Sequence, residues 1–182
     1  MIETGILEDN IVKLRALEPE DIDMLYNWEN DSKVWVVSNT LHPFSKFILE
    51  QYIQSSHQDI FQTRQLRLII SEKEKNKSVG CIDLFDFEPL HKRAGIGILI
   101  HASNDRGKGY AKSALHLLKQ YCFDYLLLNQ LYCNILEDNE RSLKLFQTGG
   151  FEITGKKKKW IYEKGKLKDE YILQLLRNDL HG

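Results

Sequence analysis

Hydrophobic residues recur along the chain with two different periods, and these periods predict alternating strands and helices. Apolar or alternating segments of strand length occupy positions 11–17, 65–71, 78–87, 93–100, 131–136, 151–162 and 168–176. Apolar residues three and four positions apart predict helices over 19–29, 44–52, 108–122 and 138–150. Ser45 is the expected cap of the second helix, and Asp138 or Asn139 that of the last. This order of elements predicts a mixed α/β sheet covered by helices.

The composition is typical of a soluble globular protein and narrows the range of functions. The 182 residues are 42% hydrophobic and 28% charged, and neither an internal repeat nor a Pro/Gly/Ser-rich linker divides them. We therefore expect a single domain over residues 1–182. The net charge of −1 argues against nucleic acid as a partner, because bulk charge would not attract it.

Signals for export, membrane insertion and metal binding are weak. The acidic N-terminus lacks the apolar core of a signal peptide, and apolar runs such as 126–128 are far too short to span a bilayer. Cys81, Cys122 and Cys133 are widely spaced and form no CxxC motif, so we expect neither a metal site nor a disulfide framework. These features predict a cytoplasmic protein with reduced cysteines and no membrane partner.

The loop before the predicted helix 108–122 carries the clearest chemical signal. Gly107 and Gly109 alternate with Arg106 and Lys108 where a strand gives way to a helix. A helix N-terminus presents unpaired N–H groups and the positive end of the helix dipole, and glycines let these groups approach an anion closely. The segment predicts a pyrophosphate site. The alternative is a tight turn flanked by solvated cations, and the sequence matches neither the Walker loop nor G-x-G-x-x-G.

Two stretches, "NDRGKGYA" (104–111) and "LEDNERSLKLFQTGGF" (136–151), resemble motifs of the GNAT superfamily of N-acetyltransferases. In the first stretch Gly107 and Gly109 match the family's Q/R-x-x-G-x-G/A loop, while Asn104 replaces the Q/R residue. The resemblance covers about 11–176 and is nearest to the spermidine/diamine and ribosomal-protein N-terminal acetyltransferase branches. It implies an α/β (α+β) fold whose mostly antiparallel sheet, with about six to seven strands, splays one strand pair for the cofactor.

The resemblance also implies acetyl-CoA as co-substrate and a set of residues that bind it. Main-chain amides of the loop would hold the pyrophosphate, the strand before the loop would pair with the pantetheine arm, and the N–H near Leu99 would support the oxyanion. Asn139 would hydrogen-bond the arm near its thiol end. The expected cofactor-binding residues are Ile98, Leu99, Ile100, Arg106, Gly107, Lys108, Gly109, Tyr110, Ala111, Asn139 and Ser142.

In the implied reaction, a neutral amine attacks the thioester directly, so one group must accept a proton and another can donate to the thiolate. Many members use a tyrosine as donor, but Phe146 stands at its position. The ribosomal-protein branch implies Ser142 as a thiol-contacting residue. Asp83, Asp86 and Glu88 are the candidate bases. Strict alternation places Asp86 with Ile82 and Leu84, and Asp83 with Cys81, Phe85 and Phe87. Which of these faces meets the cleft stays open.

The acceptor is expected to be a small-molecule or peptide amine. "KKKK" (156–159) would repel a polycation if alternation brought two lysines into the acceptor cleft, but an edge strand protected by lysine is the alternative. Trp28 and Trp35 are candidates for the cleft entrance or the core. The family resemblance leaves a homodimer open.

Two other functions remain at this point. Phe146 favours a catalytically silent acetyl-CoA-binding sensor or assembly module. The glycine loop alone is also compatible with an anion- or nucleotide-binding domain that takes no CoA.

Overall fold

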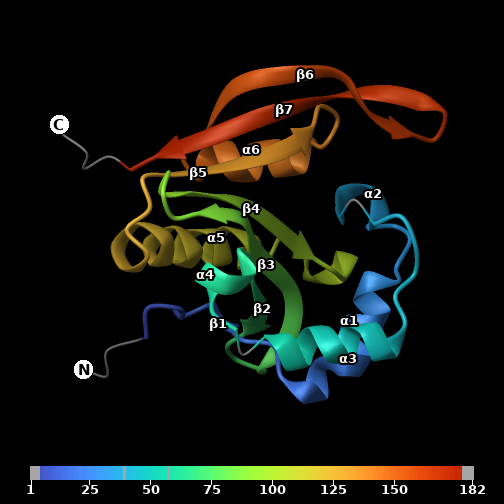
Figure 1. Ribbon diagram of the computed structural model, residues 1–182, viewed down its shortest axis with the longest axis vertical. Coiled ribbons are helices and arrows are strands. Elements are labelled where there is room, and N and C mark those ends of the chain that lie inside the picture. Colours follow the sequence, from blue (N-terminus) through green and yellow to red (C-terminus); the bar gives the residue numbers. More distant parts are fainter. Residues whose placement is uncertain (1–4, 39, 57, 178–182) are drawn as a thin grey trace.

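The computed structural model describes residues 5–38, 40–56 and 58–177, in which strands and helices follow the predicted order (Figure 1). The strands are β1 (Val12–Arg15), β2 (Leu66–Glu72), β3 (Lys77–Glu88), β4 (Arg93–Ile100), β5 (Gln130–Leu136), β6 (Glu152–Glu163) and β7 (Lys166–Leu176). The α-helices are α1 (Ile22–Glu29), α2 (Trp35–Ser38), α3 (Lys46–Ser55), α4 (Ile60–Thr63), α5 (Tyr110–Gln120) and α6 (Glu140–Thr148).

The strands form one seven-stranded sheet in the order β1-β2-β3-β4-β5-β7-β6. Every neighbouring pair is antiparallel except β4 and β5, which run parallel. The predicted mixed, mostly antiparallel sheet of about six to seven strands is therefore confirmed.

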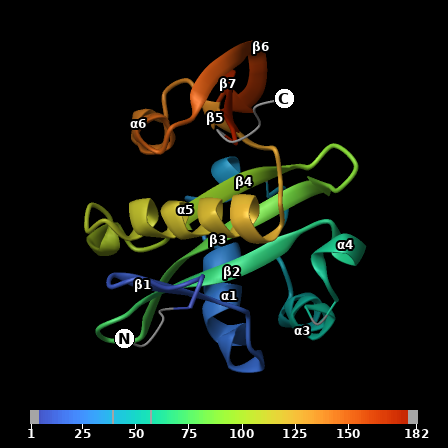
Figure 2. The same cartoon turned by 90° about the vertical axis from the view of Figure 1, so that its left-hand side faces the viewer.

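The parallel pair β4–β5 is the weak point of the sheet. Its pairing covers only Arg93–Gly95 and Gln130–Tyr132, whereas β3 stays paired with β4 as far as Ile100. Beyond Gly95 the two strands diverge, and β5 leans away with β6, β7 and α6 (Figure 2). The expected splayed strand pair is present.

Local capping residues fix where two helices begin. The Ser45 hydroxyl accepts a hydrogen bond from the Ile48 N–H at 3.3 Å, and the Asn139 side chain accepts one from the Ser142 N–H at 3.2 Å. Both residues were expected as caps, because a side-chain oxygen at this position satisfies an unpaired N–H of the first turn. The helix predicted to end at 122 instead continues as a π-helical turn over Tyr121–Tyr125.

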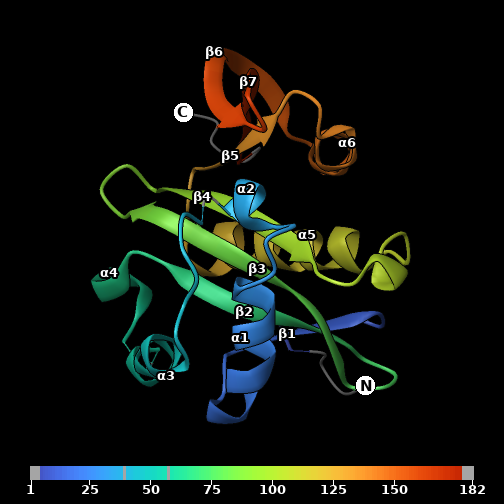
Figure 3. The same cartoon turned by 90° about the vertical axis from the view of Figure 1, so that its right-hand side faces the viewer.

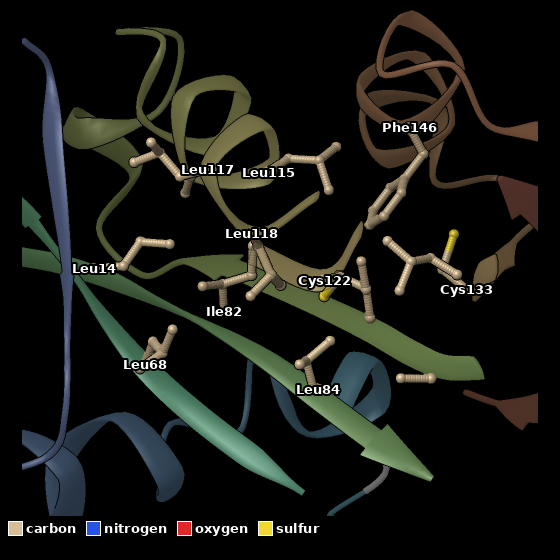
Figure 4. Packing of buried hydrophobic residues seen from close by; sticks show 14 of the residues in the cluster. Leu14, Leu68, Ile82, Leu84, Leu115, Leu117, Leu118, Cys122, Cys133 and Phe146 are labelled. Carbon is tan, nitrogen blue, oxygen red and sulfur yellow. The ribbon is translucent and has the colours of Figure 1, made fainter. Parts of the chain in front are cut away.

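Helices cover both faces of the β1–β4 part of the sheet. On one face, Leu115 and Leu118 of α5 pack over Ile82 and Leu84 of β3 (Figure 4). On the other, α1 and α3 pack against the sheet (Figure 3) through buried apolar side chains, Leu25, Leu49, Ile53, Ile69 and Cys81. Alternate residues of β3 thus enter different cores, as period-two patterning requires.

A bulge in β3 overturns part of the predicted alternation. The β3–β4 register shifts between Phe85 and Glu88, and Asp86 adopts a left-handed φ of 47°. Phe87 therefore joins the core that contains Leu84, while Asp86 is exposed. The prediction that Asp86 shares the Leu84 face and Phe87 the Asp83 face is wrong, because one extra residue in a strand reverses every side chain after it.

A second bulge changes the lysine run of β6. The β6–β7 register shifts between Lys157 and Ile161, and Lys159 has a φ of 51°. Strict alternation of two lysines to each face is therefore wrong. Since β6 forms the edge of the sheet, the run lies on an edge strand, as one of the two interpretations predicted.

In the part of the chain that the structure describes, no helix has the length and apolar character needed to cross a bilayer.

We predict that Gly80→Ala destabilises the sheet strongly. A Cβ at Gly80 would lie 2.0 Å from the carbonyl oxygen of Leu99 in β4, so the two backbones would have to separate. The free energy of unfolding should fall by about 3 kcal/mol, at the upper end of overpacking costs, in urea denaturation. Gly5→Ala is the control, since its Cβ would meet only the Glu8 side chain, at 3.9 Å. Equal urea concentrations at the midpoint of unfolding for Gly80→Ala and the wild type would contradict the prediction.

Candidate functional site

A cavity of about 630 Å³ opens where β4 and β5 diverge. The end of β4, the loop before α5 and the first turns of α5 and α6 all contribute to its wall. The lining contains most of the residues expected to bind the cofactor: Ile98, Leu99, Ile100, Arg106, Gly107, Gly109, Tyr110, Ala111, Asn139 and Ser142. The fold thus brings together two sequence stretches that are about thirty residues apart.

The loop before α5 has the backbone conformation that its glycines predict. Gly107 and Gly109 have φ values of +82° and +88°, a region that side chains other than glycine rarely adopt. Gly109 caps α5 without a side-chain hydrogen bond, and no acidic residue occupies the first turn. The N–H groups at the start of α5 therefore face the cavity mouth without a carboxylate to neutralise them, which suits an anion.

The charges of this loop are arranged differently from the sequence-based expectation. The Asp105 side chain is buried and accepts hydrogen bonds from Lys77 at 2.6 Å and Lys108 at 3.2 Å. The hydrogen bond from Lys77 is the main cause that holds the pKa of Asp105 below its ordinary value. Lys108 pairs with this carboxylate and does not line the cavity, so the prediction that its charge serves the anion site is not supported.

Arg106 does line the cavity and also ties the loop to β4. Its guanidinium donates hydrogen bonds to the carbonyl oxygens of Ile100 and His101, at 3.0 and 3.1 Å. These contacts fix the loop against the open end of the strand.

Sequence reasoning missed four cations in the same wall, namely Lys33, Lys112, Arg141 and Lys168. Lys112 and Arg141 lie in the first turns of α5 and α6. Because each helix follows a strand of the sheet, the sequence could have predicted that these two cations lie near the anion site. Lys33 comes from the α1–α2 connection, and nothing in the local pattern indicates that this segment reaches the cavity.

The direction of hydrogen bonds along β4 corrects the expected oxyanion donor. The His101 N–H donates to the Val79 carbonyl of the β3 segment at 3.1 Å, and Leu99 lies opposite Cys81. In an antiparallel pair, every second residue points both backbone groups to the same neighbour. The Leu99 N–H therefore points to β3, whereas the backbone groups of Ile98 and Ile100 point to the open edge.

A second cavity, of about 510 Å³, adjoins the first. The residues that line both are Val34, Ile98, Leu99, Leu136, Asn139 and Ser142. The two cavities therefore meet between the end of β4 and the start of α6. The wall of the second cavity also contains the aromatic side chains Trp28, Phe85 and Trp160. Trp35 instead donates its Nε1–H to the Glu29 carbonyl at 2.9 Å.

A network of charged side chains lies in the second cavity. Arg67 donates Nε–H and Nη2–H to the two oxygens of Asp83, at 2.8 and 3.0 Å, and its Nη1 contacts Glu29 Oε1. All three residues line the cavity. Asp83 is therefore at the site, but Arg67 engages both of its oxygens. The network was missed because its members are far apart in sequence.

Glu88 pairs with Arg93 at 2.9 Å and lines neither cavity. The remaining candidate base, Asp86, also lines neither cavity. The bulge turns its carboxylate to Tyr132, whose hydroxyl donates to it at 3.1 Å. Burial and the neighbouring Asp86 raise the pKa of Tyr132 to about 12. We do not retain Asp86 as a catalytic candidate.

Ser142 and Phe146 lie one turn apart on α6, at the second cavity. Phe146 is only 3% exposed, packs edge-on against Phe151 at 5.1 Å and points into the main core (Figure 4). It offers no proton. Ser142 lines both cavities, so it is the hydroxyl of α6 that lies where they meet.

Two cysteines line the second cavity as well. Burial raises the pKa of Cys81 and of Cys133 to about 12, so both thiols stay protonated near neutral pH. Because the thiolate is the reactive form, neither residue is suited to carry an acyl group as an intermediate.

Comparisons with known proteins agree with this geometry. The sequence model of the family described as "Acetyltransferase (GNAT) domain" matches residues 12–152. The spermidine N(1)-acetyltransferase of Vibrio cholerae is 26% identical over 88% of this chain and 92% of its own length. That of Escherichia coli K12 is 29% identical over 79% of this chain and 74% of its own.

A solved structure shares the fold. The crystal structure of spermidine N-acetyltransferase from Vibrio cholerae in complex with CoA and spermine superposes with a TM-score of 0.81. It covers 92% of this chain and 96% of that one, at 22% identity.

The splayed sheet, the glycine loop at α5 and the family match over 12–152 lead to one conclusion: the chain belongs to the GNAT family of acetyltransferases, whose co-substrate is acetyl-CoA.

Proposed function

We propose that the protein transfers the acetyl group of acetyl-CoA to a primary amine, either a small amine or diamine or a protein N-terminus, by direct attack. The observation that carries the proposal is that two cavities meet at Asn139 and Ser142. The first holds the cofactor and the second admits the acceptor, so the thioester and the amine come together where the cavities join. Relatives that are spermidine N-acetyltransferases support a small amine or diamine.

In this proposal, the cofactor runs from the start of α5 along the open edge of β4. The N–H groups between Arg106 and Ala111 bind the pyrophosphate, and Lys112 adds positive charge to the wall. The pantetheine arm pairs with the Ile98 carbonyl and the Ile100 N–H, as a peptide pairs with a sheet edge. Asn139 lies at the thiol end.

The chemistry follows from the groups at the junction. The amine must reach the thioester as a neutral nucleophile, so its proton passes to water or to a carboxylate of the second cavity, such as Asp83. The open N–H group of Ile98 is placed to stabilise the oxyanion of the tetrahedral intermediate. Ser142 contacts the sulfur that leaves, where Phe146 has no proton to give.

Lys157 is the member of the lysine run 156–159 that lines the second cavity, and both it and Lys156 are paired with carboxylates. Lys156 bridges Glu137 at 3.1 Å and Asp169 at 2.9 Å, and Lys157 pairs with Glu170 at 3.0 Å. Their charges are largely compensated within the fold, so the expected repulsion of a polycation loses its basis.

Self-association through the β6 edge forms part of the proposal. The β6–β7 hairpin carries several exposed apolar side chains, namely Ile153, Trp160, Tyr162 and Leu167. A spermidine N-acetyltransferase from Vibrio cholerae has been solved as a dodecamer. Light scattering over a range of concentrations would distinguish a monomer from a dimer or a larger assembly.

We predict that Gly107→Glu weakens CoA binding by at least about a hundredfold, which corresponds to the loss of one or two charge-assisted hydrogen bonds. The new carboxylate would occupy the anion site. Isothermal titration with CoA measures the effect. Gly165→Glu is a matched control, because Gly165 has the same φ of +82° with open space around it but lies in the β6–β7 turn. Equal affinities for the two variants would overturn the loop's assignment.

We predict that Ser142→Ala lowers kcat by about tenfold or more, as expected when a hydrogen bond to a developing charge is lost. The Kd for CoA should change by less than about fivefold, since one neutral hydrogen bond contributes roughly that much. Thiol release with an amine panel measures turnover. Thr148→Ala, at the other end of α6, should leave turnover unchanged. An unaltered rate for Ser142→Ala would remove the hydroxyl from the mechanism, and no thiol release by the wild type would favour a silent module.

A further inference from the structure

The second cavity carries an excess of negative charge. Its wall contains three carboxylates, from Glu29, Asp83 and Glu170, against two cations, from Arg67 and Lys157. Lys157 pairs with Glu170 at 3.0 Å, which leaves one guanidinium to serve two carboxylates. Part of the negative charge beside Arg67 is therefore uncompensated.

That charge resides mainly on Glu29. Arg67 meets Asp83 through two parallel hydrogen bonds, the strongest geometry for such a pair. Glu29 receives only the remaining Nη1 contact, at Oε1. Its Oε2 accepts no hydrogen bond from any residue in the described ranges 5–38, 40–56 and 58–177, although the side chain is only 17% exposed. This oxygen is not sealed from solvent, so it is open to a charged donor on a ligand.

The surroundings hold Glu29 firmly in place. It is the last residue of α1, and its carbonyl oxygen accepts the Nε1–H of Trp35 at 2.9 Å. Its neighbour Trp28 stacks on His101 with ring centroids 5.3 Å apart and also lines the second cavity. An aromatic face beside a carboxylate is a common environment for an ammonium group.

Glu29 is not one of the residues at the junction of the two cavities. It lines the second cavity alone, whereas Asn139 and Ser142 line both. A ligand whose reacting nitrogen lies at the junction would therefore present its far end to Glu29.

We propose that Glu29 is a specificity-determining residue that binds a second positive charge on the acceptor, with Arg67 as its positioning residue. This inference rests on the proposed acetyl transfer. The site then favours a diamine over a monoamine of the same length, because the distal ammonium donates to Glu29. It disfavours an amine with a distal carboxylate, which Glu29 repels.

The test compares three straight-chain acceptors of equal length: 1,4-diaminobutane, butylamine and 4-aminobutanoate. The wild type should show kcat/KM at least about tenfold higher for the diamine than for butylamine, since a charge-assisted hydrogen bond is worth that much. 4-Aminobutanoate should be the poorest acceptor. In Glu29→Gln, the preference for the diamine should fall to about fivefold or less through a higher KM, with butylamine little affected, because only a neutral hydrogen bond remains.

Two variants serve as controls. Glu50→Gln removes the same charge from the exposed face of α3, outside both cavities, and should keep the wild-type preference. Glu29→Asp keeps the charge and should keep a preference for the diamine. CoA titration of each variant should match the wild type, because Glu29 does not line the first cavity. If Glu29→Gln does not fold, salt offers a second test, since added salt should lower the wild-type preference by screening the ammonium–carboxylate attraction.

The outcomes separate this inference from the proposed function. Equal kcat/KM for diamine and butylamine in the wild type overturns the role of Glu29, while acetyl transfer stands. The role of Glu29 is also overturned if folded Glu29→Gln keeps the full preference for the diamine, or if added salt leaves the preference of the wild type unchanged. Failure of the wild type to acetylate any of the three acceptors, or any other amine, overturns the proposed function and the inference with it.

Discussion

The site depends on where the parallel pairing of β4 and β5 stops. The two strands share register over only three residue pairs, from Arg93 to Gly95, and then diverge. Backbone groups that would have bonded within the sheet are left open along β4 at Ile98 and at the Ile100 N–H, whereas the Ile100 carbonyl accepts a hydrogen bond from Arg106. Unpaired edge groups are normally a liability for a protein. Here the unpaired groups of β4 border a cavity, so an extended ligand can form hydrogen bonds with them.

Charge is distributed around this gap in a way that matches the two ligands. The first cavity combines the start of α5 with several cations, and the buried Asp105 is compensated by Lys77 and Lys108. The second cavity has more carboxylates than cations. An anionic cofactor and a cationic acceptor would therefore each meet a wall of opposite charge, and only neutral groups such as Asn139 and Ser142 lie where they meet.

Much of the fold could be predicted from the sequence, because short-range rules decide it. The periods of apolar residues, the caps at Ser45 and Asn139 and the glycines before α5 all act within one turn or strand. The failures occur where one residue shifts a register. The bulge at Asp86 places Phe87 on the other face of β3, and no local sequence pattern predicts a bulge at this position. Ion pairs between distant segments, such as that of Arg67 with Glu29, could not be predicted either, because a single sequence does not specify which charged side chains come into contact.

The central claim is that the N–H groups at the start of α5 bind the pyrophosphate of the cofactor while its arm follows the open edge of β4. A crystal structure of the protein with CoA tests it most directly. The account predicts the pyrophosphate oxygens within hydrogen-bond distance of the main chain at 107–111 and the pantetheine amides paired with Ile98 and Ile100. A nucleotide bound elsewhere, or an arm that leaves the edge of β4 unpaired, would contradict it.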